Sequence, residues 1–339
     1  MVTIYDIARI TKTSHTTVSR ALHGNARISP ETTARILQVA RELEYAPSHS
    51  AKSLRSGKTH SIGVLVRSLK SHFYTDFFTA LDDACYQHGY SVFVSTSEFD
   101  VVREERNLRA FLSKQFDAVV LDRSQPRLYD DIINQIIEQG IKVVLLGEFD
   151  VPNLPYPVVG FDEIAVARLA AEHLWTLGHR NILYFNAGKT KDASVRTHQV
   201  RRANFTEVWK KMSHGMDVPC FQTADPYFGG KELADYLENL PKEKRPTAVV
   251  CSTDPLAVST LSVLHARNIK VPDYISIISC DDIESPFIPV PLTTIRLPRD
   301  KEAQGVWQLL RNLLADTEME NNRIVIEPEL IVRQSTRAV

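Results

Sequence analysis

The chain has 339 residues, of which 43% are hydrophobic and 24% are charged, and its formal net charge is −1. This chain is long enough for more than one packed core, so its length and composition predict two or three domains. No apolar run approaches the roughly 18 residues of a membrane span, and no basic start precedes an apolar signal-peptide core, so we expect a cytoplasmic protein without membrane contact.

The charges are unevenly distributed along the chain. Residues 1–58 contain nine Lys or Arg and four Asp or Glu, a net charge of +5, whereas the remainder carries −6. A basic head followed by an acidic body is typical of a DNA-binding module joined to a domain with a different role.

The basic head is predicted to contain three short helices. The first follows Thr3, and the third follows Ser29-Pro30-Glu31, which combines an N-cap residue, a proline suited to the first turn and an acid near the positive helix end. A short connection, 11–13, leads into the second helix. Apolar residues at helical spacing give each helix one face for a small shared core: Ile4, Ile7, Ala8, Val18, Ala21, Leu22, Ile36, Ala40 and Leu43.

The stretch 14–22 combines an N-cap candidate, an apolar face and a polar face. Ser14 can accept a free backbone N–H of the first turn. His15, Thr16, Ser19 and Arg20 fall on the side opposite the apolar residues, and they carry the groups that read base edges and hold phosphates. An ordinary amphipathic surface helix is the alternative, but the short turn and the basic surroundings favour a helix-turn-helix.

Four linked motifs occur in order in the head: TIYDIA at 3–8, TVSRAL at 17–22, ISPET at 28–32 and LEYAP at 43–47. In this combination they resemble the LacI/GalR (lactose/galactose repressor) family of transcription regulators. The turn departs from the family pattern, because Thr13 stands where valine is usual and its hydroxyl needs a partner. The resemblance implies a DNA-binding domain over 1–46 with these contacts: Thr3, Tyr5, Ser14, His15, Thr16, Thr17, Ser19 and Arg20.

Residues 47–58 are predicted to form a linker with one short helix. Pro47 blocks extension of the third helix, and two turns are too few to be stable alone. The resemblance implies a hinge helix that forms on operator DNA, pairs with its dimer mate and wedges Leu54 into the minor groove. A Leu54 that contacts the body is the alternative. The implied hinge contacts are Ala51, Lys52, Leu54 and Arg55.

From residue 61 onward, continuous apolar runs alternate with helical sequence. Such runs are typical of strands buried on both faces in parallel βαβ units. They are too many for one sheet, so we expect an α/β body of two doubly wound subdomains, with ligands bound at the carboxyl ends of the strands. The predicted strands are 62–66, 90–94, 118–121, 141–146, 182–185, 248–251 and 275–278. The predicted helices are 74–88, 102–115, 128–139, 163–177, 197–212, 230–239 and 255–267.

Motifs in the body at 177–182, 251–257, 275–282, 291–295 and 329–333 resemble the effector-binding and dimer domain of the same family, which is similar to periplasmic sugar-binding proteins. The resemblance implies an effector and dimerisation domain over 59–339 whose chain crosses between subdomains three times. The expected N-subdomain covers about 60–160 and 292–322. The expected C-subdomain covers about 161–291 and 323–339.

The resemblance also implies effector contacts at the strand ends that face the cleft. Carboxylates and a guanidinium suit vicinal hydroxyls, and an aromatic ring suits the C–H face of a sugar. Several assignments stay open, since Asp254 or Asp281 could be caps, Arg196 rivals Arg201, and Phe228 rivals Tyr227. The implied contacts are Phe73, Tyr74, Asp122, Ser124, Arg196, Arg201, Tyr227, Asp254 and Asp281.

The nature of the effector is the least determined prediction. If Lys189, Lys191 and Arg196 line the cleft, they favour an anion such as a sugar phosphate or sugar acid over a neutral sugar. The alternative is that these residues belong to a solvated surface loop with no role in binding. The four cysteines include no CxxC pair, and no catalytic motif stands out, so we expect no metal, cofactor or enzymatic activity.

The function predicted from these features is a homodimeric, effector-controlled repressor that binds a pseudo-palindromic operator. One alternative is a regulator controlled by a protein partner. The other is a sugar-binding or sugar-metabolising protein whose head is a tether.

Overall fold

The computed structural model describes residues 2–22, 27–45, 58–69, 72–147, 151, 153–188, 196–225, 228–283, 288–319 and 321–339. The chain divides into two compact units, Met1–Thr59 and His60–Val339. Five predicted contacts, together with Lys189 and Lys191, lie outside the described residues. These five contacts are Ala51, Lys52, Leu54, Arg55 and Tyr227.

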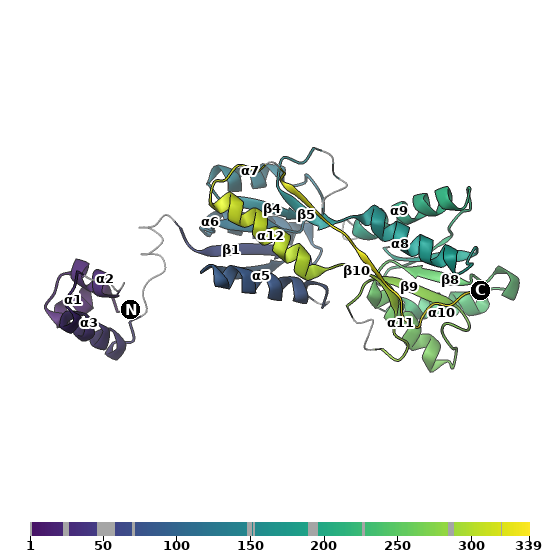
Figure 1. Cartoon of the computed structure of the whole chain (residues 1–339), viewed down its shortest axis with the longest axis horizontal. Coiled ribbons are helices and arrows are strands. Elements are labelled where there is room, and N and C mark those ends of the chain that lie inside the picture. The colour runs from purple at the N-terminus through teal and green to yellow at the C-terminus, as the bar shows by residue number, and fades with distance from the viewer. Residues whose placement is uncertain are drawn as a thin grey trace. The chain divides into compact units, whose positions relative to one another are not determined.

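The first unit contains the three predicted helices, α1 (Ile4–Thr11), α2 (His15–Leu22) and α3 (Pro30–Glu42) (Figure 1). Their apolar faces pack into one core, as the spacing predicts. The side chains of this core that are buried are Ile7, Ala8, Val18, Ala21, Ile36 and Ala40.

Side-chain caps fix the starts of these helices. Ser14 Oγ accepts the Thr17 N–H at 3.0 Å, and Ser29 accepts the Thr32 N–H, so both predicted caps are confirmed. The carboxylate of Asp6 accepts the Thr3 N–H at 3.0 Å. These bonds satisfy N–H groups that have no partner within a first helical turn.

The turn between α1 and α2 accommodates the departure from the family pattern. The hydroxyl of Thr13 lies 2.8 Å from that of Thr11, which provides the partner that the sequence requires. Lys12 has left-handed backbone angles, φ 50° and ψ 41°, a conformation in which a Cβ atom is strained. The turn therefore has its expected shape, with strain at one residue.

The second unit contains two six-stranded sheets, and the predicted α/β class is confirmed. The first sheet has the order β11-β5-β4-β3-β1-β2, and all its pairs are parallel. Its strands are β1 (Ser61–Val66), β2 (Ser91–Thr96), β3 (Ala118–Leu121), β4 (Lys142–Leu146), β5 (Val158–Phe161) and β11 (Arg323–Ile326). Its helices are η1 (His72–Tyr74), α5 (Thr75–Gln87), α6 (Val101–Ser113), α7 (Asp130–Glu138) and α12 (Arg299–Leu314).

The second sheet has the order β12-β10-β9-β8-β6-β7, and β10 pairs with β12 in the antiparallel direction. Its strands are β6 (Ile182–Ala187), β7 (Cys220–Thr223), β8 (Ala248–Cys251), β9 (Ser276–Asp281), β10 (Thr293–Arg296) and β12 (Glu329–Ile331). Its helices are α8 (Glu163–Thr176), α9 (Arg196–Met212), α10 (Gly230–Asn239), η3 (Lys242–Lys244) and α11 (Asp254–Ala266).

Helices cover both faces of each sheet. On the first sheet, α5 and α12 lie side by side on one face, while α6 and α7 cover the other (Figure 1). On the second sheet, α8 and α9 form one layer and α10 and α11 the other. This double cover explains why β1, β3 and β8 are buried along nearly their whole length.

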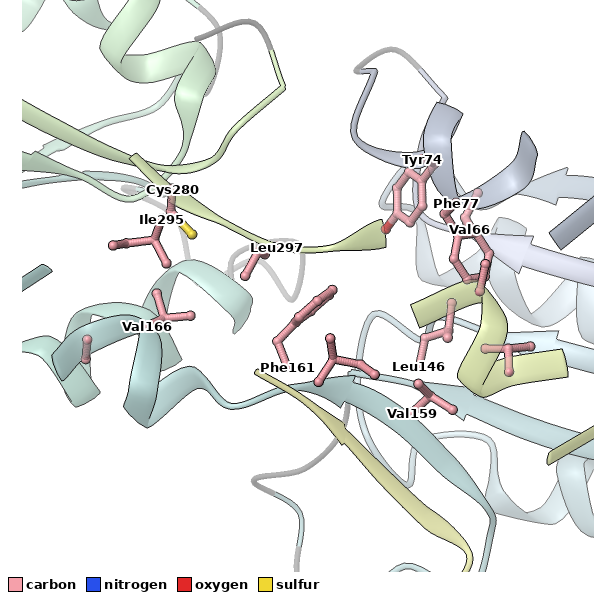
Figure 2. Packing of buried hydrophobic residues seen from close by; sticks show 14 of the residues in the cluster. Val66, Tyr74, Phe77, Leu146, Val159, Phe161, Val166, Cys280, Ile295 and Leu297 are labelled. Carbon is pink, nitrogen blue, oxygen red and sulfur yellow. The ribbon is translucent and has the colours of Figure 1, made fainter. Parts of the chain in front are cut away.

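One apolar cluster runs through both subdomains. Figure 2 shows Phe161 and Leu297 between the side chains of the first sheet, such as Leu146, and those of the second, such as Ile295. Phe161 is the last residue of β5 and Leu297 directly follows β10, each at a point where the chain passes from one sheet to the other. The connection between the two subdomains is therefore filled by packed apolar side chains.

The predicted subdomain boundaries at 292 and 323 are wrong. The second crossing follows β10, which pairs with β9 and so belongs to the second sheet. The third crossing follows β11, which pairs with β5 of the first sheet. The short polar run at 293–296 gives little apolar signal, because Thr293 and Thr294 are buried through hydrogen bonds instead. The strands β5, β7 and β10 to β12, and the helix α12, were not among the predicted elements.

Candidate DNA-binding and effector sites

The exposed polar face of the head is built from α1 and α2. His15, Thr16 and Arg20 are exposed on α2, as the spacing predicts. Tyr5 of α1 is 65% exposed, and the centroid of its ring lies 5.2 Å from that of His15. These side chains present imidazole, hydroxyl, phenol and guanidinium groups to water, which suits contact with base edges and phosphates.

The other predicted DNA contacts have partners inside the head. The Thr3 hydroxyl donates to the Asp6 carboxylate at 2.8 Å. The Ser14 hydroxyl lies 2.8 Å from that of Thr17, and Thr17 and Ser19 are partly buried. These residues shape the helix ends, so a DNA contact from them would be additional to a structural role.

A cavity of about 60 Å³ lies in the second unit, between the two subdomains. It receives side chains from η1 and the strand ends of the first sheet, and from the N-terminal turns of α8, α9 and α12. Six of the predicted effector contacts that the structure describes, including Phe73, line the cavity. The lining residues are Arg67, Phe73, Tyr74, Asp122, Arg123, Ser124, Leu146, Gly147, Phe161, Glu163, Arg196, Thr197, Arg201, Arg299 and Glu302.

The wall formed by the first sheet centres on Asp122. Because β1 and β3 are neighbours, Arg67 and Asp122 meet after the strand ends, and Arg67 Nε donates to Asp122 Oδ2 at 3.1 Å. The Tyr74 hydroxyl donates to the same oxygen. Burial raises the pKa of Tyr74, so this hydroxyl keeps its proton. One carboxylate oxygen of Asp122 thus accepts hydrogen bonds from both side chains.

A hydrogen bond joins the two walls. Arg67 Nη1 donates to Thr197 Oγ1 of α9 at 2.8 Å. Since Arg67 is anchored on the first sheet and Thr197 on the second subdomain, this bond holds the two walls of the cavity together. The sequence did not single out Arg67, although it follows an apolar run in the same way that Asp122 does.

The wall formed by the second sheet centres on Arg201. Its Nε donates to Glu163 at 3.1 Å, and its Nη1 donates to Asp281 Oδ1 and to the Ser252 carbonyl, each at 3.0 Å. The side chains of Arg201 and Asp281 are each 4% exposed. Burial raises the pKa of Asp281, and the Arg201 guanidinium opposes that rise. Asp281 lies behind Arg201 and orients it, rather than lining the cavity itself.

Asp254, like Asp281, does not line the cavity. It is fully buried, and its carboxylate accepts hydrogen bonds from Ser279, from Thr294 and from the Ile283 N–H. The N-cap of α11 is Thr253, so the alternative of Asp254 as the cap is also wrong.

Ser124 lines the cavity, but its polar groups face away from an incoming ligand. Its N–H donates to the buried carboxylate of Glu104 at 3.0 Å, and its hydroxyl donates to the same carboxylate. Burial raises the pKa of Glu104, and the bonds from Ser124 oppose this rise. Ser124 and Glu104 together fix the loop that carries Asp122 and Arg123.

Arg299 and Glu302 occupy the first turn of α12, which the sequence did not identify. Arg299 Nη1 donates to Glu302 at 2.6 Å. The guanidinium carbon of Arg299 lies 3.2 Å from the centre of the Phe73 ring and 4.8 Å from that of Phe161. Pro298 before a helix start could have signalled this element.

His198 of α9 lies behind the cavity. Its Nδ1 is 2.9 Å from the Ser252 hydroxyl. Burial and the nearby guanidinium groups of Arg201 and Arg67 lower the pKa of His198 to about 3, so the ring is neutral at physiological pH. Within the described ranges, no cluster of three or more His, Cys, Asp or Glu could hold a metal ion, and no helix is long and apolar enough to cross a bilayer.

Comparison with known proteins gave matches over both units. The model described as "bacterial regulatory proteins, lacI family" matches residues 3–48, and that described as "periplasmic binding protein-like domain" matches residues 171–336. The HTH-type transcriptional repressor PurR of Mannheimia succiniciproducens is 28% identical over 341 residues, which cover 100% of both chains.

Solved structures share the fold of the chain. The Lac repressor dimer bound to operator and the anti-inducer ONPF aligns with a TM-score of 0.83 and 22% identity over 99% of each chain. The complex of the transcriptional regulator CelR with cellobiose aligns with a TM-score of 0.67 and 22% identity, covering 99% of this chain and 100% of that one.

Proposed function

The chain belongs to the LacI family of bacterial transcription regulators, as its motifs predicted, and we propose that it represses transcription as a homodimer. In this proposal residues 1–46 bind DNA, residues 47–58 form the hinge, and residues 59–339 bind the effector and dimerise. Because a two-fold dimer presents two identical heads, its operator is a pseudo-palindrome. In this proposal the chain acts in the cytoplasm and has no catalytic role.

The observation that carries the proposal is the polar face of α2. His15, Thr16 and Arg20 face water from a helix whose other side is packed and whose start is capped by Ser14. A rigid helix with short polar groups and one guanidinium on its outer face suits insertion into a major groove.

The cavity between the subdomains is the proposed effector site. Carboxylates, guanidinium groups and the Phe73 ring meet there, which suits a sugar or a sugar derivative such as a sugar phosphate or sugar acid. Because Arg67 and Thr197 join the two walls, an effector that competes for them changes the closure of the cleft. The effector controls DNA binding only if its affinity differs between the two states.

Selection of bound sequences from a random DNA pool tests this function on the full-length chain. We expect a two-fold symmetric sequence to be enriched and protected over both half-sites. Addition of a panel of sugars, sugar phosphates and sugar acids should then change the affinity for the selected DNA. Enrichment of no symmetric sequence would contradict the proposed repressor.

A further inference from the structure

The carboxylates in the wall of the cavity already have cationic partners. Asp122 is paired with Arg67 at 3.1 Å, Glu163 with Arg201 at 3.1 Å, and Glu302 with Arg299 at 2.6 Å. A carboxylate that is bound by a guanidinium has fewer free lone pairs for the hydroxyl groups of a neutral sugar. The acids of this site are therefore poorly placed to be the main ligands.

Cations outnumber these acids along the wall. The described lining residues include five arginines and three carboxylates, and the two additional arginines are Arg123 and Arg196. Arg123 Nη1 lies 2.7 Å from Oδ1 of Asp130, and Asp130 does not line the cavity. Arg201 likewise pairs with Asp281, which lies outside the lining, at 3.0 Å, so the surface of the cavity itself carries more cations than acids while acids behind it balance part of this charge.

Arg299 has a buried donor without a partner. Its side chain is 10% exposed, and its Nη1 is held by Glu302. Its Nε has no hydrogen-bond partner and is shielded from water. A guanidinium stacked on an aromatic ring directs its N–H groups outward along its edge, and Phe73 holds Arg299 in this way at 3.2 Å. An unpaired buried N–H is unfavourable until an acceptor reaches it.

Other side chains of the cavity complement this donor. Arg67 and Thr197 lie in the same lining, where they join the two walls. The rings of Phe73 and Phe161, with Leu146, supply apolar surface next to the guanidinium group. The cavity of about 60 Å³ holds roughly two water molecules, so a larger ligand has to separate Arg67 from Thr197.

We infer that the effector carries an anionic group, a carboxylate or a phosphate, and that Arg299 binds this group together with Arg67. This inference rests on the proposed function of the cavity as an effector site. It names the chemical class of the ligand and the two residues that select it. Binding of the anion opens the bond between Arg67 and Thr197, which links recognition to movement of the subdomains.

Thermal unfolding of the full-length chain in simple anions tests the inference. The three tryptophans, Trp175, Trp209 and Trp307, all lie in the second unit, so their fluorescence reports on the body and not on the head. Inorganic phosphate and acetate are each compared with chloride at equal ionic strength. We expect at least one of them to raise the midpoint by about 2 °C or more. Phosphate alone would indicate a phosphorylated effector, and acetate alone a carboxylic acid.

Variants separate this site from general salt effects. Arg299→Gln should abolish the shift, whereas Arg311→Gln, which removes the same charge from an exposed position of the same helix, should keep it. If Arg299→Gln fails to fold because Glu302 is left unpaired, the double variant Arg299→Gln/Glu302→Gln removes both charges and should also lose the shift.

Two results would overturn the inference. A wild-type midpoint that is equal in all three salts would exclude an anion site, and a shift that persists in both Arg299 variants would exclude Arg299. Operator binding by the same preparations is measured in parallel. Intact operator binding with no anion response would reject this inference alone, whereas loss of operator binding in the wild type would reject the proposed function.

Discussion

The head and the cleft satisfy their polar side chains in opposite ways. In the head, His15, Thr16 and Arg20 belong to one helix and are exposed to water. In the cleft, Arg201 and Asp281 come from positions 80 residues apart, and their side chains are each 4% exposed and paired at 3.0 Å. The head therefore keeps its donors ready for a partner, whereas the cleft uses its donors to hold itself together.

This difference separates the effects of mutation. Removing the exposed Arg20 side chain from the head should lower affinity for DNA and leave the stability of the fold nearly unchanged, because the side chain is not part of the packed core. Removing a member of a buried ion pair in the cleft should lower the stability of the body, because the remaining charge is left without a partner.

The largest effect is expected for Arg201→Ala. This change leaves Glu163 and Asp281 without their shared guanidinium, and the loss of one partner from a buried ion pair costs about 3–5 kcal/mol of unfolding free energy. Urea unfolding followed by tryptophan fluorescence measures it. Lys211→Ala, which removes an exposed ion pair from the same helix, is the control and should leave the midpoint unchanged. Equal midpoints for the two variants would contradict the contrast.

Arg20→Ala should act on DNA binding instead. Loss of a guanidinium that reads a base costs roughly 1–3 kcal/mol, or about ten- to a hundred-fold in affinity for the selected operator. Mobility shifts at fixed salt measure it, and circular dichroism should show unchanged unfolding. Arg35→Ala removes the same charge from an exposed position of α3, and should weaken all DNA sequences alike. A specific footprint that survives Arg20→Ala would remove α2 as the reading helix.

The sequence predicted the head well because its signals are local. A cap and its acceptor lie three residues apart in Ser14 and Thr17, and the inward face of α2 follows from the spacing of Val18 and Ala21. Neither inference needs knowledge of distant segments. The same holds for the strands β1, β3 and β8, whose continuous apolar runs identify them without reference to their neighbours.

The cleft could be predicted only in part, because its pairs depend on strand order. The end of β3 indicated Asp122, but its partner Arg67 is determined by the position of β1 next to β3. Arg299 belongs to α12, which follows the second crossing between the sheets, and the sequence placed that crossing before β10 instead of after it. The missing information was topological, not chemical.

A smaller effect is expected from acid. The pKa of His198 is lowered to about 3 in the folded chain from an ordinary value near 6.5, so below pH 6.5 the unfolded chain takes up a proton that the folded chain does not. Stability contributed by this residue is therefore present above pH 6.5 and is lost as the pH falls, by about 1–2 kcal/mol at pH 5.

His198→Gln should reduce this loss. Urea unfolding at pH 7 and pH 5 measures the difference in unfolding free energy for each protein, and the variant should show the smaller one. His173 and His179 also have pKa values lowered by burial, so part of the acid sensitivity remains in the variant. An identical pH dependence in the two proteins would show that His198 is accessible to protons in the folded state.

The smallest effect is expected at Lys12, the residue with strained backbone angles in the turn between α1 and α2. Its left-handed backbone, φ 50° and ψ 41°, strains any residue with a Cβ atom, so Lys12→Gly should stabilise the head by roughly 0.5–1 kcal/mol. Amide hydrogen exchange at Val18, whose N–H is bonded to Ser14, should slow about two- to fivefold. Lys12→Ala removes the same charge but keeps the Cβ atom, and should give no such slowing. Equal protection in the two variants would mean that charge, not backbone strain, limits the stability of the turn.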